Sequence, residues 1–309
     1  MGNEIINMGY PVYNAIMGLV VGDAVGLPYE GKERNTFRCE AMTGFGTYKQ
    51  PPGTWSDNSS MTLATVASLV KNDGKINLGD MMKQFRSWLY KGKFTPWGKV
   101  ISFGSTARYA IARYSEKENN VYSCGGRELL TNDAGSLSRI LPLAFIETTG
   151  KDIFEVSGLT HAHEVSQTAC MIYVTYAKKL YHGVDRDEAL VETLHECEWC
   201  LTNDFVRLKN IKNVSRDDIS NYIYVVSILE AALWCFLTSN DYRECILKAV
   251  NLGNDSDTTA AIAGGLAGLY WGVDGDGIPL MWLEDVAGTA EIGRLCEKFN
   301  EILNKIQSD

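Results

Sequence analysis

Apolar residues recur at intervals of three and four along most of this chain, and this spacing constrains the fold more than any other feature. It places the apolar side chains on one face of a helix. Many of the periodic stretches begin at Ser, Asp or Asn, and several end near Gly or Asn, as helices commonly do. Signals for strands are few. The pattern predicts helices over residues 13–26, 59–72, 79–92, 136–150, 166–183, 185–203, 221–239 and 253–272.

The helical stretches follow one another without a clear boundary between domains. The 309 residues include only 7 prolines and no low-complexity or linker-like tract. With 45% hydrophobic residues, the chain can bury a large core. We therefore predict an all-α fold with a single compact multi-helix domain spanning residues 1–309.

The charge balance limits the classes of partner. The formal net charge is −9, and no stretch supplies the basic patch that binding to a phosphate backbone requires. We therefore expect no nucleic acid as the main partner. The first residues lack a basic region, and no apolar run approaches the ~18 residues of a membrane span. These observations predict a cytoplasmic protein without a membrane partner.

The cysteines are scattered through the chain, many of them within helix-like apolar patterns. Such placement favours reduced thiols in the core over a framework of disulfides. Cys197 and Cys200 form an isolated C-E-W-C motif. A structural zinc or a redox centre is the alternative interpretation of this pair.

The segment "GNDSDTTAAIAGG" places Asp255 and Asp257 at the entrance of a very apolar helix. One aspartate could cap the helix and complement its dipole, but a second is not needed for that purpose. Two carboxylates at this spacing repel each other unless they are solvated, protonated or bridged by a cation. The segment is therefore either an exposed acidic turn or part of a metal site.

A second helix start, "GTWSDNSS", also gathers oxygen ligands, at Ser56, Asp57 and Asn58. If the two starts meet in space, Asp57 and the aspartates of the first segment bring three negative charges together. Such a group requires one or two hard divalent cations with oxygen ligands. The sequence alone does not show that the two starts meet.

Four ordered segments resemble the successive signatures of the ADP-ribosylglycohydrolase family. They are "GLVVGDAVGLPYEG", "GTWSDNSSMTLATVASL", "LTHAHEVSQTACMIYV" and "GNDSDTTAAIAGGLAGLYWGVDGDGIPLMW". The resemblance implies an all-α domain that hydrolyses the C1″ glycosidic bond of ADP-ribosylated side chains or of related ADP-ribose derivatives. It also implies two Mg²⁺ or Mn²⁺ ions in a cleft, and an ADP-ribosylated protein or a small ADP-ribose derivative as the partner.

The resemblance assigns roles to individual residues. Glu30 matches a cleft glutamate that acts in substrate or water activation, and Asp57 is the second candidate catalytic residue. Gly135, Ser136 and His161 match positions near the ribose and diphosphate of ADP-ribose. The implied metal ligands are Ser56, Asp57, Asn58, Asp255, Asp257 and Thr258.

This chain departs from the family pattern at several of these positions. Asn58 stands where a second aspartate is usual, so one of the two ions should bind more weakly. Ala134 and Ser138 replace an asparagine and a methionine in the loop expected to bind the diphosphate. Two alternatives to the enzyme therefore remain: a catalytically weakened homologue that binds ADP-ribose, and a crystallin-like structural protein.

Overall fold

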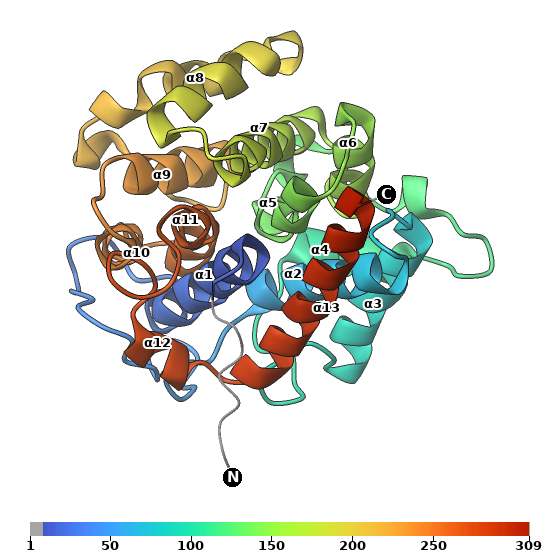
Figure 1. The fold of residues 1–309 in the computed structure, drawn as a ribbon, viewed down its shortest axis with the longest axis horizontal. Helices are drawn as coiled ribbons and strands as arrows, with labels where there is room; N and C mark the ends of the chain where they lie inside the picture. Colours follow the sequence, from blue (N-terminus) through green and yellow to red (C-terminus); the bar gives the residue numbers. More distant parts are fainter. Residues whose placement is uncertain (1–8, 309) are drawn as a thin grey trace.

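A computed structural model describes residues 9–308 as a packed assembly of helices (Figure 1). Within these residues β structure is limited to isolated bridges such as that between Phe45 and Gln50. The predicted all-α fold is therefore confirmed. The α-helices are α1 (Pro11–Gly26), α2 (Asp57–Lys71), α3 (Leu78–Lys91), α4 (Ser105–Arg113), α5 (Gly135–Arg139), α6 (Gly150–Gly158), α7 (Glu164–Tyr181), α8 (Arg186–Glu196), α9 (Val225–Leu237), α10 (Tyr242–Val250), α11 (Ser256–Trp271), α12 (Leu280–Asp285) and α13 (Thr289–Ser308).

Side-chain caps define several helix starts, as the sequence predicts. The Ser56 hydroxyl accepts a hydrogen bond from the Asn58 N–H at the start of α2. At the start of α6, Thr149 and Asp152 form a reciprocal capping box. Each cap satisfies backbone N–H groups that have no partner inside the helix.

Helices α1 and α11 pack against each other at the centre of the fold, where Figure 1 shows them side by side. Their contact is backbone to backbone. A Cβ atom added at Gly18 would lie 2.3 Å from the Gly264 carbonyl oxygen, and one added at Gly22 would lie 2.1 Å from the Ala260 oxygen. Only residues without a side chain permit this approach. The glycines at four-residue spacing therefore bring the two helices into register.

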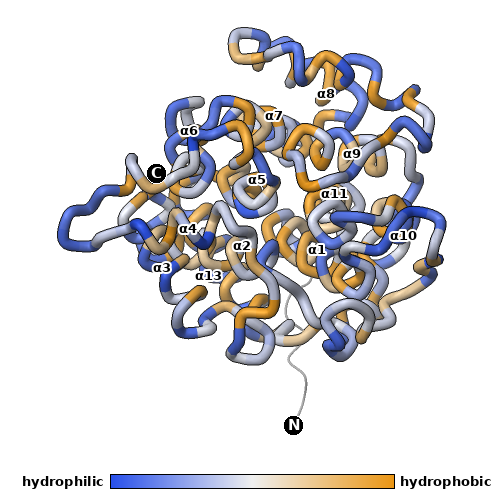
Figure 2. The backbone as a smooth tube through the Cα atoms, turned by 180° about the vertical axis from the view of Figure 1, so that it is seen from behind, coloured by the Kyte–Doolittle hydropathy of each residue, from blue (hydrophilic) through white to orange (hydrophobic). Residues whose placement is uncertain are grey.

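The remaining helices surround this pair and cover its apolar surface. Figure 2 shows hydrophobic segments concentrated in the interior, along α1, α7, α9 and α11, whereas α8 at the periphery is more polar. Helix α13 crosses one side of the molecule and contacts both α1 and α2 (Figure 1). The central pair is thus shielded by neighbouring helices.

The expectation that no apolar run reaches the length of a membrane span is wrong. The segment Pro11–Tyr29 is long and apolar enough by composition, with a mean hydropathy of 1.2. In the structure residues 12–29 of this segment are all buried inside the protein. Its apolar character is that of a core helix enclosed on all sides.

One predicted helix, over residues 136–150, is divided in the structure. Helix α5 ends at Arg139, and a separate 3₁₀-helix, η4, covers Leu141–Phe145. Pro142 accounts for the break, because proline has no N–H for an α-helical hydrogen bond and disfavours the α conformation of the residue before it. The predicted stretch 185–203 is shorter as well: α8 ends at Glu196, and η5 (Glu198–Cys200) follows.

Candidate active site

The two acidic helix starts meet in space, although they are far apart in sequence. The Asn58 side-chain nitrogen at the start of α2 donates to the Thr258 hydroxyl of α11, with a distance of 3.1 Å. The α1–α11 contact produces this meeting, because a Cβ at Gly26 would lie only 2.5 Å from the Asp257 Cα. The polar entrance of α11 is thereby held against the end of α1.

Asp23, on α1, fixes the start of α2. It is fully buried, and its Oδ2 accepts hydrogen bonds from the Ser56 N–H at 3.0 Å, the Ser59 N–H at 3.0 Å and the Ser59 hydroxyl at 2.6 Å. A carboxylate in this position satisfies free N–H groups and complements the positive end of the helix dipole. Asp23 therefore positions Ser56 and the residues that follow it.

Six carboxylates lie close enough for their charges to influence one another. We call them the acid cluster: Asp23, Glu30, Asp57, Asp133, Asp255 and Asp257. Burial, reinforced by neighbouring carboxylates, raises the pKa of Glu30 to about 7 and that of Asp255 to about 6. Burial likewise raises the pKa of Asp57 and of Asp257. Both causes disfavour the charged forms and leave the cluster in need of positive charge.

Several carboxylate oxygens in the cluster have no hydrogen-bond partner within the protein. They are Oδ1 of Asp23, Oε2 of Glu30 and Oδ1 of Asp257. Asp255 occupies the N-cap position of α11, but its side chain makes no capping hydrogen bond. Capping therefore does not explain the aspartate pair at this helix start. Buried polar atoms are normally satisfied, so these oxygens are available to a ligand.

Glu30 and Asp57 face the acid cluster from two further segments. Glu30 directly follows η1 (Leu27–Tyr29), which continues from the end of α1. The Tyr48 hydroxyl lies beside its carboxylate and opposes the effect of burial on the Glu30 pKa. Asp57 accepts a hydrogen bond at 3.2 Å from the N–H of Gly104, just before α4. The structure thus brings both candidate catalytic carboxylates to the place where the helix starts meet.

A hydrogen-bonded chain holds Asp133 at the edge of the cluster. Arg139 donates to the Thr160 hydroxyl at 2.7 Å, and that hydroxyl lies 2.8 Å from His161 Nδ1. His161 Nε2 lies 2.7 Å from Asp133 Oδ1. Since an ionised carboxylate can only accept, Nε2 donates to Asp133, and Nδ1 of the neutral ring accepts the Thr160 proton. This chain fixes both the tautomer and the orientation of the His161 ring.

Asp133 differs from its neighbours because its pKa is lowered. Burial alone would raise the pKa, but the His161 side chain, the Thr106 hydroxyl and the Gly135 N–H outweigh that effect. Its side chain is 12% exposed, whereas His161 is fully buried. Asp133 is therefore an ionised carboxylate held in a fixed position.

The residues expected near the ribose and diphosphate have different environments. Gly135 lies directly beside the His161 ring, because a Cβ at Gly135 would be 3.1 Å from His161 Cε1. The Ser136 side chain is fully buried, and its hydroxyl accepts a hydrogen bond from Ser157 at 3.1 Å. Gly135 and His161 thus share one location with Asp133, while the Ser136 hydroxyl faces the core.

The donor atoms at the meeting point suit a hard divalent cation. They are carboxylate, hydroxyl and amide oxygens, and three of the buried carboxylate oxygens have no partner. Carboxylates alone do not complete a ligand set: among residues 9–308, no three His, Cys, Asp or Glu side chains are grouped to hold one ion. A cation would therefore also require neutral oxygens, which Ser56 and Thr258 supply.

Asn58 links the two helix starts in place of a charged ligand. Its amide nitrogen donates to Ser56 Oγ at 3.2 Å and to Thr258 Oγ1 at 3.1 Å. An aspartate at this position has no proton to donate to these hydroxyls. The side chain that departs from the family pattern thus satisfies two of the candidate ligands through its N–H groups.

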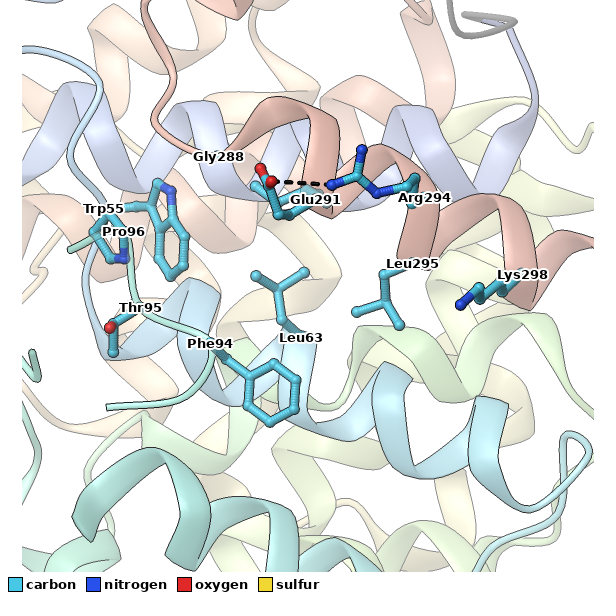
Figure 3. Close-up of a pocket in the computed structure, with 11 residues that line it drawn as sticks. Trp55, Leu63, Phe94, Thr95, Pro96, Gly288, Glu291, Arg294, Leu295 and Lys298 are labelled. Atoms are coloured by element: carbon cyan, nitrogen blue, oxygen red, sulfur yellow. Dashed lines mark hydrogen bonds and ion pairs between the residues drawn. The ribbon is translucent and has the colours of Figure 1, made fainter. Parts of the chain in front are cut away.

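A separate hollow lies between α2, α13 and the loop at Phe94 (Figure 3). Its volume is about 470 Å³, and its walls are mainly apolar, with Trp55, Leu63 and Leu295 facing the space. An ion pair between Glu291 and Arg294, at 2.9 Å, lies at its edge. No member of the acid cluster lines this hollow, so it lacks the groups that hydrolysis of a glycosidic bond requires.

Sequence reasoning missed Asp23 and Asp133 as site residues. A signal was present for Asp23, since it is a charged residue within the otherwise apolar segment 15–27. A charged side chain in a buried helix needs a specific partner. Asp133 lies in a polar loop next to the expected substrate residues, but nothing in the local pattern distinguishes it from a solvated turn residue.

Comparisons with known proteins agree with this geometry. The family model described as ADP-ribosylglycohydrolase matches residues 11–308. The chain is 29% identical over 289 residues to an ADP-ribosylarginine hydrolase, Tri1, of Pseudomonas putida strain GB-1, covering 92% of this chain and 76% of that protein. It is 30% identical over 291 residues to an ADP-ribosyl-[dinitrogen reductase] glycohydrolase of Rhodospirillum rubrum, covering 87% of each.

A solved structure from the same family resembles this chain in fold. It is described as an ADP-ribosylglycohydrolase-related protein complex, and its TM-score with this chain is 0.79 at 26% sequence identity. The similarity covers 95% of this chain and 98% of the solved one. The shared architecture therefore extends over nearly the entire length of both chains.

Proposed function

Since the chain belongs to the ADP-ribosylglycohydrolase family and is a glycosidic hydrolase, we propose that it cleaves the C1″ bond between ADP-ribose and an amino-acid side chain. The arginine linkage is the first candidate, because the names of two relatives specify ADP-ribosylarginine hydrolase and a third specifies an ADP-ribosylated protein. The partner is then an ADP-ribosylated protein or a small ADP-ribose derivative.

The proposal rests on the meeting of the two helix starts and the unpartnered carboxylate oxygens there. Mg²⁺ or Mn²⁺ would be held by oxygens of Ser56, Asp57, Asn58, Asp255, Asp257 and Thr258. When bound, such a cation neutralises the carboxylates, orients ribose hydroxyls and polarises a water molecule. Two ions are proposed, one of them weakly held because Asn58 contributes no charge.

Glu30 is proposed to take a proton from the attacking water at its unpartnered Oε2. Without a cation, burial raises the pKa of Glu30 to about 7, and a cation beside it would favour the charged carboxylate, the form that accepts a proton. Asp57, oriented by the Gly104 N–H, adds negative charge where a positively charged sugar develops as the glycosidic bond breaks. Asp133 and His161 are proposed to hold the substrate at the cluster's edge.

The unpartnered oxygens also discriminate between the enzyme and a purely structural protein. Buried carboxylates without partners reduce stability, so a purely structural protein gains nothing from them. Such costs are typical of functional sites, where a ligand or a reaction uses the groups. The acid cluster therefore favours a hydrolase over a crystallin-like protein.

Turnover on a defined linkage tests the proposal. Purified protein should release free ADP-ribose from an ADP-ribosylarginine peptide when Mn²⁺ is present, and the rate should fall to background after treatment with a chelator. A peptide bearing ADP-ribose on serine, assayed in parallel, distinguishes the two linkages. The absence of ADP-ribose from both substrates would contradict the proposed activity.

A further inference from the structure

Cys197 and Cys200 lie beside α7, where α8 passes into η5, and take no part in the proposed reaction. Cys197 is the residue directly after α8, and Cys200 is the last residue of the short helix η5. Thr175 and Thr168, both on α7, lie beside the two thiols. The pair is therefore a separate feature of the molecule, and conclusions about it do not depend on the acid cluster.

The backbone between the two cysteines holds their side chains on the same side. The Cys200 N–H donates to the Cys197 carbonyl at 2.9 Å, which closes a tight turn. In such a turn the first and fourth Cα atoms lie within about 7 Å, and side chains three residues apart are eclipsed in a 3₁₀-helix. Disulfides need Cα separations of about 4.4–6.8 Å. The turn thus brings the two Cα atoms near the separation at which a disulfide forms.

The two thiols also lie close together, since each one shifts the pKa of the other. The Cys200 sulfur additionally lies 3.2 Å from the Cys197 carbonyl oxygen. Both sulfurs therefore converge on the same turn.

Exposure differs between the pair and the other thiols. Cys197 is fully buried, whereas Cys200 is half-buried and open to a small reagent. Each of the other cysteines among the described residues is buried. The neighbouring Cys197 side chain lowers the pKa of the Cys200 thiol, which burial would otherwise raise, and the thiolate form is the reactive one.

We propose that Cys197 and Cys200 form a redox-responsive pair that closes to a disulfide when hydrogen peroxide reaches Cys200. The Cys200 thiolate sulfur attacks one peroxide oxygen, the O–O bond breaks, and the departing hydroxide takes up a proton as water. The Cys197 sulfur then attacks the resulting sulfenic sulfur. Its proton leaves with the hydroxyl group as a second water. Overall, two thiols are oxidised and one peroxide is reduced.

The arrangement of cleavage sites makes the bond directly measurable. Residues 187–207 contain no internal Lys or Arg, follow Arg186 and include only these two cysteines. The reduced full-length protein is treated with hydrogen peroxide, blocked with iodoacetamide and digested with trypsin. We expect the peptide 187–207 to lose the mass of two hydrogens and to carry no alkyl group. Recovery of this peptide with both cysteines alkylated would overturn the proposal.

Single substitutions assign the roles within the pair. In Cys197→Ser, Cys200 should remain as a sulfenic acid that dimedone captures, whereas in Cys200→Ser, Cys197 should stay unoxidised. Cys39→Ser, a change at a buried cysteine elsewhere, is the control and should form the disulfide as the wild type does. Equal oxidation of Cys197 with and without Cys200 would refute the assignment. Far-UV circular dichroism of each variant verifies that it is folded.

Discussion

Replacing Gly22 by alanine tests whether the close α1–α11 contact is required for the fold and the site. The new Cβ would lie 2.1 Å from the Ala260 oxygen and 2.7 Å from the Ala260 carbonyl carbon. Real Cβ atoms essentially never approach other atoms closer than 3.0 Å. Because backbone atoms face each other, no side chain can move aside, and the helices must separate by roughly 1 Å in a tightly packed interior.

The expected loss of stability combines two opposing effects. Overpacking of a core costs about 1–3 kcal/mol, and a clash between backbones belongs at the upper end of that range. Alanine favours a helix over glycine by about 1 kcal/mol, which offsets part of the cost. We therefore expect Gly22→Ala to lower the free energy of unfolding by about 2 kcal/mol. The same separation displaces Asp257 from Gly26, so turnover should fall as well.

Urea unfolding followed by far-UV circular dichroism measures this change. Gly158→Ala is the matched control, because Gly158 also lies in a helix but an added Cβ would meet nothing closer than 3.4 Å. The control should equal or exceed the wild type in stability. If Gly22→Ala were as stable as Gly158→Ala, the contact between α1 and α11 would not be the constraint described above.

Three further predictions concern individual polar side chains. Asn58→Asp should tighten Mn²⁺ binding in calorimetry, because a charged oxygen replaces an amide at the proposed cation site; an unchanged or weaker affinity would place the ion elsewhere. Glu30→Gln should reduce kcat about 100-fold or more while the protein stays folded, as expected for loss of a general base; wild-type turnover would remove Glu30 from the mechanism. Asp80→Asn should lower the free energy of unfolding at pH 7 by about 1–2 kcal/mol, through loss of charged hydrogen bonds from Lys71 and its other partners. These bonds outweigh the effect of burial and lower the pKa of Asp80 in the folded protein. The ionised Asp80 side chain therefore stabilises the fold above the unfolded-state pKa, and this stabilisation disappears as the pH falls through the lower folded-state pKa. In urea titrations, the difference in unfolding free energy between Asp80→Asn and the wild type should therefore shrink below about pH 4. The control Asp217→Asn, at an exposed site, should change the free energy of unfolding by less than about 0.5 kcal/mol at either pH.

The helices could be predicted from the sequence because their signals are local. The apolar periodicity, together with the capping signals at Ser56 and Gly92, places helix ends within a few residues of those observed in the structure. Prediction failed over residues 136–150, where Pro142 interrupts an apolar periodic stretch. There the backbone constraint of one residue overrides the periodicity of its neighbours.

The candidate site was predictable only in part, because its geometry depends on long-range contacts. Both acidic helix starts were visible, but their meeting depends on the packing of glycines along α1 and α11. The four-residue spacing of Gly18, Gly22 and Gly26 was a usable signal for that contact. The role of Asp133 was not visible, since it comes from a chain of hydrogen bonds that reaches Asp133 through His161.

Calorimetric titration of Mn²⁺ tests most directly whether the two helix starts form one cation site. Wild-type protein, stripped of metal, should bind Mn²⁺, and Asp257→Asn should remove or strongly weaken the binding, because it takes away a charge at the centre of the acid cluster. Asp217→Asn, at an exposed site outside the acid cluster, should bind as the wild type does. Equal Mn²⁺ binding by wild type and Asp257→Asn, or no binding by either, would contradict the proposed site.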